Sequence, residues 1–168
     1  ANWTLTTAGL RSYLDADFDP TNSQRAIASG TGGFVSVFST NGGQSWQNAA
    51  YTPAISLGGS TGRIEIAYAP SNPSIVYSMI DATQGAGQPP PTGTLVKGNL
   101  YKSLDGGATF TLVNASNPNN TFLGAQGNYD NIIWVNPQDP NFVVVGGINM
   151  YRSTDGGLNW GAIANGGN

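Results

Sequence analysis

The feature that most constrains the fold is an octapeptide that occurs three times, at residues 39–46, 103–110 and 153–160. Each copy has a serine, an aspartate or asparagine two residues later, a glycine pair and a final aromatic residue. The defining residues are Ser39, Asn41, Gly43 and Trp46; Ser103, Asp105, Gly107 and Phe110; and Ser153, Asp155, Gly157 and Trp160. Aspartate or asparagine can bond the backbone two residues on, and glycine supplies positive φ. Because an aromatic or alternating run precedes each copy, the octapeptide predicts a turn between two strands.

A second repeated element, a turn rich in proline and asparagine, precedes each octapeptide. It lies at residues 18–22, 68–73 and 135–140, and strand-like runs stand on both of its sides. The unit is therefore strand A, proline turn, strand B, loop, strand C, octapeptide turn and strand D. This order predicts a four-stranded antiparallel meander, the blade of a β-propeller. No segment has the sustained apolar period of a helix.

The repeats divide the chain into three blades, so we expect an all-β partial propeller. We assign residues 1–8 to an orphan strand, 10–50 to blade 1, 58–115 to blade 2 with a loop insertion at 82–98, and 125–165 to blade 3. Three blades cannot close a ring, because propellers have roughly four to eight. The expected partners therefore include the remaining blades of a longer chain or further copies of this chain.

Composition excludes several classes of function. Six basic and nine acidic residues give a net charge of −3, so we expect no nucleic-acid binding. The chain has no histidine and no cysteine, which removes the commonest metal and haem ligands and the Ser-His-Asp and Cys-His catalytic sets. We expect no metal and no cofactor. No apolar run is long enough to span a membrane.

The octapeptides resemble the Asp-box, or BNR repeat, of sialidases, xyloglucanases and sortilin-type propellers; Asn41 and Phe110 are the departures at the defining aspartate and tryptophan positions. The likeness covers nearly the whole chain and extends to secreted bacterial propellers of sortilin-like or glycoside hydrolase description, through residues 62–66, 70–73 and 127–130. It implies an extracellular or cell-surface location. It also implies that the boxes lie opposite the ligand-binding face. A sialidase is disfavoured, because Gly62-Arg63-Ile64-Glu65 lacks the aromatic residue and proline of the sialidase motif.

One pair of carboxylates occupies matching positions in neighbouring blades. Asp15 and Glu65 each stand five residues before the proline of their turn. Adjacent inner strands could hold them at the separation that glycoside hydrolysis uses, so they are the candidate catalytic pair. The alternative is that each faces solvent or pairs with Arg11 or Arg63.

Candidate ligand-binding residues combine amides, aromatic rings and charge, which suit stacking on a sugar and bonding its hydroxyls. They are Arg11, Tyr13, Tyr51, Arg63, Gln126, Asn128, Tyr129 and Asp130. Ordinary loop polarity is the alternative interpretation. We expect Trp134, within a strand A, to lie in the core.

Three functions are consistent with these observations. The first is a secreted or cell-surface propeller segment that binds a carbohydrate or protein ligand without catalysis. The alternative is part of a xyloglucanase-like glycoside hydrolase that uses a carboxylate acid and base. The third is a structural surface or filament subunit, since open arcs with unpaired edges can polymerise by strand addition.

Overall fold

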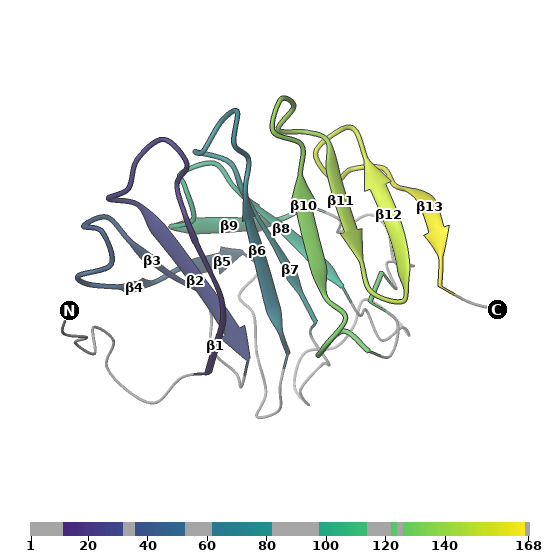
Figure 1. Ribbon diagram of the computed structural model, residues 1–168, viewed down its shortest axis with the longest axis horizontal. Helices are drawn as coiled ribbons and strands as arrows, with labels where there is room; N and C mark the ends of the chain where they lie inside the picture. The colour runs from purple at the N-terminus through teal and green to yellow at the C-terminus, as the bar shows by residue number, and fades with distance from the viewer. Residues whose placement is uncertain are drawn as a thin grey trace.

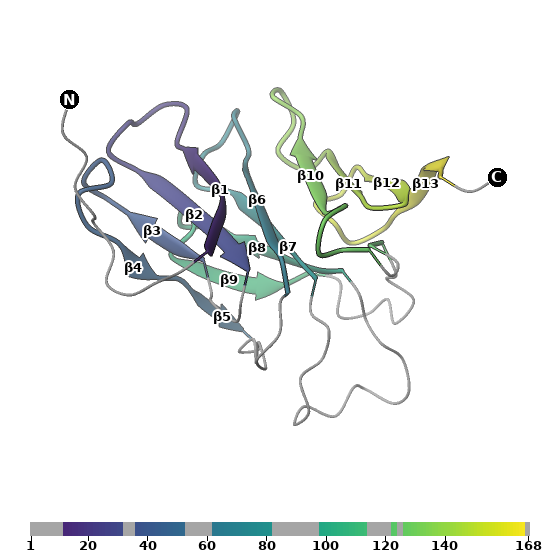
Figure 2. The same ribbon diagram turned by 60° about the horizontal axis from the view of Figure 1, so that its bottom comes forward.

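The computed structural model describes residues 12–31, 36–52, 62–81, 98–113, 122–123 and 126–166. These residues form thirteen strands and no helix, arranged as three sheets side by side (Figures 1 and 2). None of them forms a helix with the length and apolar character that crossing a membrane requires. The all-β partial propeller expected from the repeats is confirmed.

The first and third sheets are four-stranded antiparallel meanders in chain order, as the repeat predicts. The first sheet contains β1 (Ser12–Phe18), β2 (Ala26–Thr31), β3 (Val37–Ser39) and β4 (Gln47–Asn48). The third contains β10 (Ile132–Val135), β11 (Val143–Gly146), β12 (Asn149–Ser153) and β13 (Gly161–Asn165). We call these sheets blade 1 and blade 3.

The middle sheet, blade 2, has a fifth strand that the sequence analysis did not predict. Its antiparallel strands are β6 (Ile64–Tyr68), β7 (Val76–Ile80), β8 (Asn99–Ser103) and β9 (Thr109–Leu112). Strand β5 (Ala50–Thr52) follows β4 of blade 1 and pairs with β9 in parallel. The short sequence of β5 carries no separate strand signal. Within the pair, Tyr51 of β5 stacks on Phe110 of β9 with ring centroids 4.7 Å apart.

Each octapeptide forms a turn that its own side chains hold closed. In the second copy, Asp105 accepts hydrogen bonds from the Ser103 hydroxyl (2.7 Å) and from the backbone N–H groups of Ala108 and Thr109 (3.0 and 2.9 Å). The Ser103 hydroxyl in turn accepts from the Gly107 N–H at 2.9 Å. The same bonds of the serine recur in the other two copies: Ser39 donates to Asn41 and Ser153 donates to Asp155, and each serine hydroxyl accepts from a glycine N–H. The glycine pairs have positive φ in all three copies, as expected.

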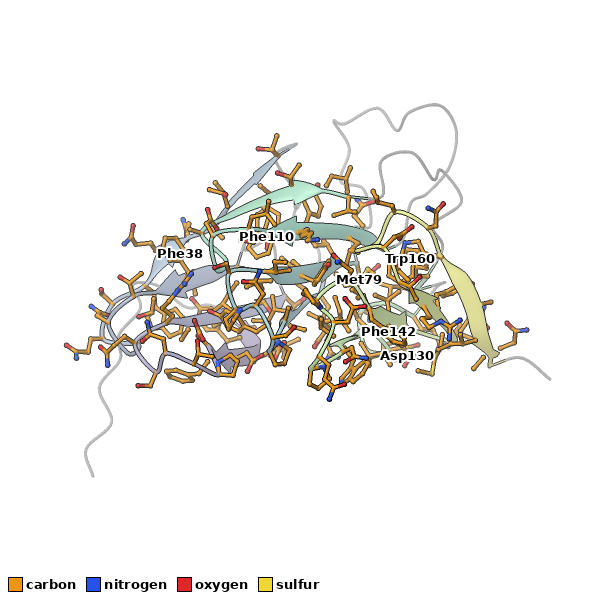
Figure 3. All side chains as sticks on the ribbon, turned by 90° about the horizontal axis from the view of Figure 1, so that it is seen from above. Phe38, Met79, Phe110, Asp130, Phe142 and Trp160 are labelled. Atoms are coloured by element: carbon orange, nitrogen blue, oxygen red, sulfur yellow. The ribbon has the colours of Figure 1, made fainter. Side chains whose placement is uncertain are left out.

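The octapeptide turns also pack one blade on the next. A β-carbon added to Gly107 would lie 2.7 Å from Ile27 of blade 1, and one added to Gly157 would lie 2.6 Å from Leu100 of blade 2. Two apolar cores fill the spaces between blades 1 and 2 and between blades 2 and 3. Figure 3 shows Phe110 and Met79 within the assembled sheets, with Trp160 in blade 3. Glycine is therefore required at these positions both by φ and by the close approach of the preceding blade.

The predicted domain limits stay predictions. The orphan strand at 1–8 and nearly all of the insertion at 82–98 lie outside the described residues.

Candidate functional site

Apart from Tyr51, the described candidate residues lie in the three innermost strands, β1, β6 and β10, or in the segments just before them. Strand β6 contacts both β1 and β10, so the inner strands of the three blades are neighbours (Figure 1). The octapeptide and proline turns lie together at one end of the sheets, where the Gly106 N–H donates to the Ser74 carbonyl at 2.8 Å. The same bond joins Gly42 to Gln24 and Gly156 to Asn141. The described candidates from the inner strands thus lie away from the octapeptide turns.

Asp15 spans the junction between blades 1 and 2. Its Oδ2 accepts a hydrogen bond from the backbone N–H of Ile66 in β6 at 3.1 Å. Two residues further along β1, burial raises the pKa of Asp17, the backbone N–H of Tyr68 lowers it, and the nearby charge of Asp15 raises it. The two carboxylates therefore face successive outward N–H groups of the neighbouring inner strand. This arrangement satisfies backbone donors of β6 that no strand of its own sheet reaches.

Glu65 lies beside Asp15 and forms an ion pair with Arg63, whose Nε donates to Glu65 Oε1. Burial raises the pKa of Glu65; the Arg63 guanidinium lowers it, and the charge and contact of Asp15 raise it again. The net direction is upward, so burial and the second carboxylate together outweigh the guanidinium. The structure therefore brings Asp15 and Glu65 together, and it gives each a partner within the protein.

Arg63 also fixes the turn that precedes blade 3. Its Nη1 donates to the carbonyl of Tyr129 at 3.1 Å, and the N–H groups of Tyr129 and Asp130 both donate to the Gln126 carbonyl, at 3.0 and 2.9 Å. The backbone of this turn is held at three points. The side chain of Tyr129 is nonetheless 59% exposed, and that of the neighbouring Asn128 is exposed as well. We call residues 126–130 the Tyr129 turn.

Asn131 is a positioning residue that the sequence analysis missed. It is buried, and its Nδ2 donates to the carbonyls of Met79 (3.0 Å) and Arg63 (3.3 Å). Beside it, a β-carbon on Gly127 would lie 2.7 Å from Cγ of the buried Asp81. These contacts attach the Tyr129 turn to blade 2. In an asparagine-rich loop, no sequence signal separates such a residue from its solvated neighbours.

One other candidate, Tyr51, lies elsewhere. Tyr51 is in the core between blades 1 and 2, where its hydroxyl contacts those of Ser36 (2.8 Å) and Ser78 (3.1 Å). Burial raises the pKa of Tyr51 to about 12, and its ring, stacked on Phe110, is not available to a ligand. The expectation that Tyr51 binds a ligand does not fit this position; the aromatic ring closes an interface between blades.

The remaining candidates occupy varied environments. Tyr13 is half-buried at the start of β1, and Arg11 lies outside the described residues. Trp134 is 49% exposed on β10, so the expectation that it lies in the core was wrong. Its side of β10 faces away from blade 2, and the described residues place no sheet against it.

The described residues hold no group of three or more acidic, histidine or cysteine side chains that could bind a metal ion. The octapeptide acids are occupied by the turns. Hydrogen bonds from the Asn159 backbone and side chain lower the pKa of Asp155 to about 2, as expected for a carboxylate that holds its charge to bond the turn.

Three adjoining, mostly antiparallel sheets whose innermost strands are neighbours define an arc of a β-propeller. Comparison with solved structures agrees with this class of fold. The chain is similar to an ancestral GH74 enzyme (23% identity, TM-score 0.59), with 90% of this chain and 18% of that chain covered. It is similar to the GH74 xyloglucanase from Xanthomonas campestris, with 18% sequence identity, a TM-score of 0.59, and 90% of this chain and 21% of that chain covered. It is also similar to YCF48 bound to D1 peptide, with 15% sequence identity, a TM-score of 0.60, and 94% of this chain and 41% of that chain covered.

The chain spans less than half the length of each of these similar structures. No protein-family model and no curated protein matches the sequence. The shared property is the propeller fold.

Proposed function

We propose that the chain is a noncatalytic, ligand-binding segment of a β-propeller that acts outside the cell or at its surface, and that the Tyr129 turn contacts the ligand. The observation that carries the proposal is the contrast between two sets of side chains in and just before the inner strands. The candidate catalytic carboxylates are engaged within the protein, whereas Tyr129 projects into solvent from a fixed backbone. The resemblance of the octapeptides to those of secreted propellers supports the extracellular part of the proposal.

Catalysis by the Asp15–Glu65 pair would require at least one of the two carboxyl groups to face a substrate. Asp15 instead accepts a backbone N–H of the next blade, and Glu65 pairs with Arg63. Freeing either group would leave a polar group of the blade junction without its partner, and this costs free energy. Both carboxylates therefore fit a structural role better than a catalytic one.

The chemistry of the Tyr129 turn suits a carbohydrate. An exposed aromatic ring can stack on the apolar face of a sugar, and the exposed amide of Asn128 can bond its hydroxyls. Arg63 holds the backbone carbonyl of Tyr129, so little backbone conformational entropy is lost when the ring binds. A protein ligand is the second class; the similarity to a propeller solved with a peptide supports it.

The alternative function is part of a glycoside hydrolase. Its support is the raised pKa of Glu65, a property that a general acid needs, together with the similarity to GH74 structures. In that case the second carboxylate could come from outside these residues.

Binding and turnover can be measured on the same samples. Titration with xyloglucan oligosaccharides should show binding that Tyr129→Ala weakens by about tenfold, the order of a lost stacking contact. Leu158→Ala, which removes an exposed side chain from an octapeptide turn, is the matched control and should bind like the wild type. Binding unchanged by Tyr129→Ala would remove the Tyr129 turn from the proposal. Hydrolysis by the wild type that is lost in both Asp15→Asn and Glu65→Gln would favour the enzyme instead.

A further inference from the structure

One guanidinium ties the Tyr129 turn to the inner strand of blade 2. Arg63 donates from Nη1 to the carbonyl of Tyr129 at 3.1 Å and from Nε to the carboxylate of Glu65. Both donors belong to one rigid plane, so the direction of one bond fixes the direction of the other. Glu65 and Tyr129 are therefore linked, although they stand far apart in the sequence.

The backbone and the side chain of Arg63 are held by different groups. Its carbonyl accepts from the Asp81 N–H at 2.9 Å and from Nδ2 of Asn131 at 3.3 Å, so the backbone is fixed between blades 2 and 3. The guanidinium is held by a carboxylate: within the described part of the chain, Glu65 is the one acid that forms an ion pair with Arg63. The bond to Tyr129 thus depends on the Glu65 carboxylate for its orientation.

This ion pair is largely removed from water. The side chains of Arg63 and Glu65 are 24% and 13% exposed. An exposed pair contributes little because water screens it, but the attraction grows as water is excluded. Protonation of Glu65 would replace a charge-assisted hydrogen bond by a weaker neutral one, and the guanidinium would lose the contact that orients it.

Glu65 takes up its proton at a higher pH than the acids that hold the octapeptide turns. Burial raises the pKa of Glu65 from the ordinary 4.5, Arg63 lowers it, and the charge of Asp15 raises it again. Hydrogen bonds lower the pKa of Asp105, and they lower that of Asp155 to about 2. A moderate fall in pH therefore acts on Glu65 while these turns keep their charge.

Other titratable groups lie on the elements packed against β6. Asp15 of β1 is the neighbouring acid whose charge acts on Glu65, whereas Asp17 faces the backbone of Tyr68. Strands β2 and β10 also contact β6, and they carry no titratable side chain. The titratable residues of β1, of β6 and the residue before it, of β7 and the residue after it, and of the Tyr129 turn are Tyr13, Asp15, Asp17, Arg63, Glu65, Tyr68, Tyr77, Asp81, Tyr129 and Asp130.

We propose that the Glu65–Arg63 ion pair positions the Tyr129 turn for its ligand, so that the turn binds the ligand more weakly when Glu65 is protonated. This inference rests on the proposed function, because it concerns the same turn. The charged pair holds the guanidinium, and the guanidinium holds the carbonyl beside the exposed ring. In acid the turn loses one of the contacts that order it, and binding must then supply the cost of that order.

Titration with a xyloglucan oligosaccharide between about pH 5 and pH 8 tests the proposal. We expect the affinity to fall about fivefold on the acid side, the order of one ion pair. Glu65→Gln, which keeps the size of the side chain and carries no charge, should bind at every pH as weakly as the wild type binds in acid. Asp17→Asn removes another acid of raised pKa and is the matched control, with the pH dependence of the wild type. A constant wild-type affinity, or the same pH profile in Glu65→Gln, would overturn the proposal.

A measurement without ligand separates this inference from the proposed function. The Tyr129 N–H donates to the Gln126 carbonyl, so its NMR resonance reports the state of the turn. We expect this resonance to shift with a midpoint above pH 4.5 in the wild type and in Asp17→Asn, and to lack that transition in Glu65→Gln. If the resonance follows Glu65 but the oligosaccharide binds at no pH, the link to Glu65 stands and the proposed function fails. A resonance that does not respond to Glu65 would overturn the link, whether or not the oligosaccharide binds.

Discussion

Replacement of Asp105 tests whether the octapeptide acids hold turns. The carboxylate accepts four hydrogen bonds, from the Ser103 hydroxyl, from the N–H groups of Ala108 and Thr109, and from the Thr109 hydroxyl at 2.6 Å. The first octapeptide already contains the conservative variant. There Asn41 accepts the matching serine and backbone bonds, and its Nδ2 donates to a serine hydroxyl at 2.8 Å.

The expected magnitudes follow from these contacts. Asp105→Ala removes all four bonds, but the turn is exposed and water can replace part of them, so the loss should be about 2 kcal/mol of unfolding free energy. Asp105→Asn can keep the pattern of Asn41 and should lose about 0.5 kcal/mol. For a chain of this length, thermal unfolding should fall by about 4–8 °C for the alanine variant and by about 1–2 °C for the asparagine variant.

The pH dependence of the stability of these variants provides a second test. Burial acts to raise the pKa of Asp105, but hydrogen bonds from Thr109, Ser103 and Ala108 outweigh it and lower the pKa below the ordinary 3.8. The stability from this group is therefore fully present above the unfolded pKa and is lost as the pH falls through the folded one. The difference in unfolding free energy between the wild type and Asp105→Asn should narrow as the pH drops below about 4. Equal losses of unfolding free energy in Asp105→Asn and Asp105→Ala would refute the reasoning.

Three further variants test the blade junctions. Tyr51→Phe leaves two buried serine hydroxyls without their partner and should cost about 1–2 kcal/mol in urea unfolding, whereas no cost would mean that the hydroxyl does not join the blades. Gly157→Ala places a methyl group against Leu100 at positive φ and should cost about 2 kcal/mol, while Gly161→Ala, in open space, should cost nothing. Burial raises the pKa of Glu65, so the stability from this group is present below the unfolded pKa and is lost as the pH rises through the folded one. Glu65→Gln should therefore gain stability relative to the wild type as the pH rises above the ordinary glutamate pKa of 4.5, and a difference in unfolding free energy that stays constant with pH would contradict the raised pKa.

The repeats could be predicted from sequence because their signals are local. A serine, an acid and a glycine pair specify a turn within eight residues, and the proline turns fix where the strands begin. The sequence also placed Asp15 and Glu65 near each other, because equal spacing from the prolines means equal height on neighbouring inner strands.

The missed features depend on contacts between blades. Strand β5 pairs with β9, and Tyr51 stacks there on Phe110, which lies far away in the sequence. Asn131 is buried because two carbonyls of blade 2 receive its amide. Trp134 has the pattern of a core residue, and it is exposed because the described chain offers no blade against its side of β10. Sequence periodicity reports which side of a strand is apolar and does not report what covers it.

The central claim is that the chain binds a ligand without cleaving it. Native mass spectrometry of the chain incubated with a xyloglucan oligosaccharide tests both binding and cleavage, because the mass of the adduct reveals whether the bound sugar is intact. We predict an adduct with the whole oligosaccharide and no shorter products in solution. Shorter products that are absent from the Asp15→Asn and Glu65→Gln incubations would contradict the claim.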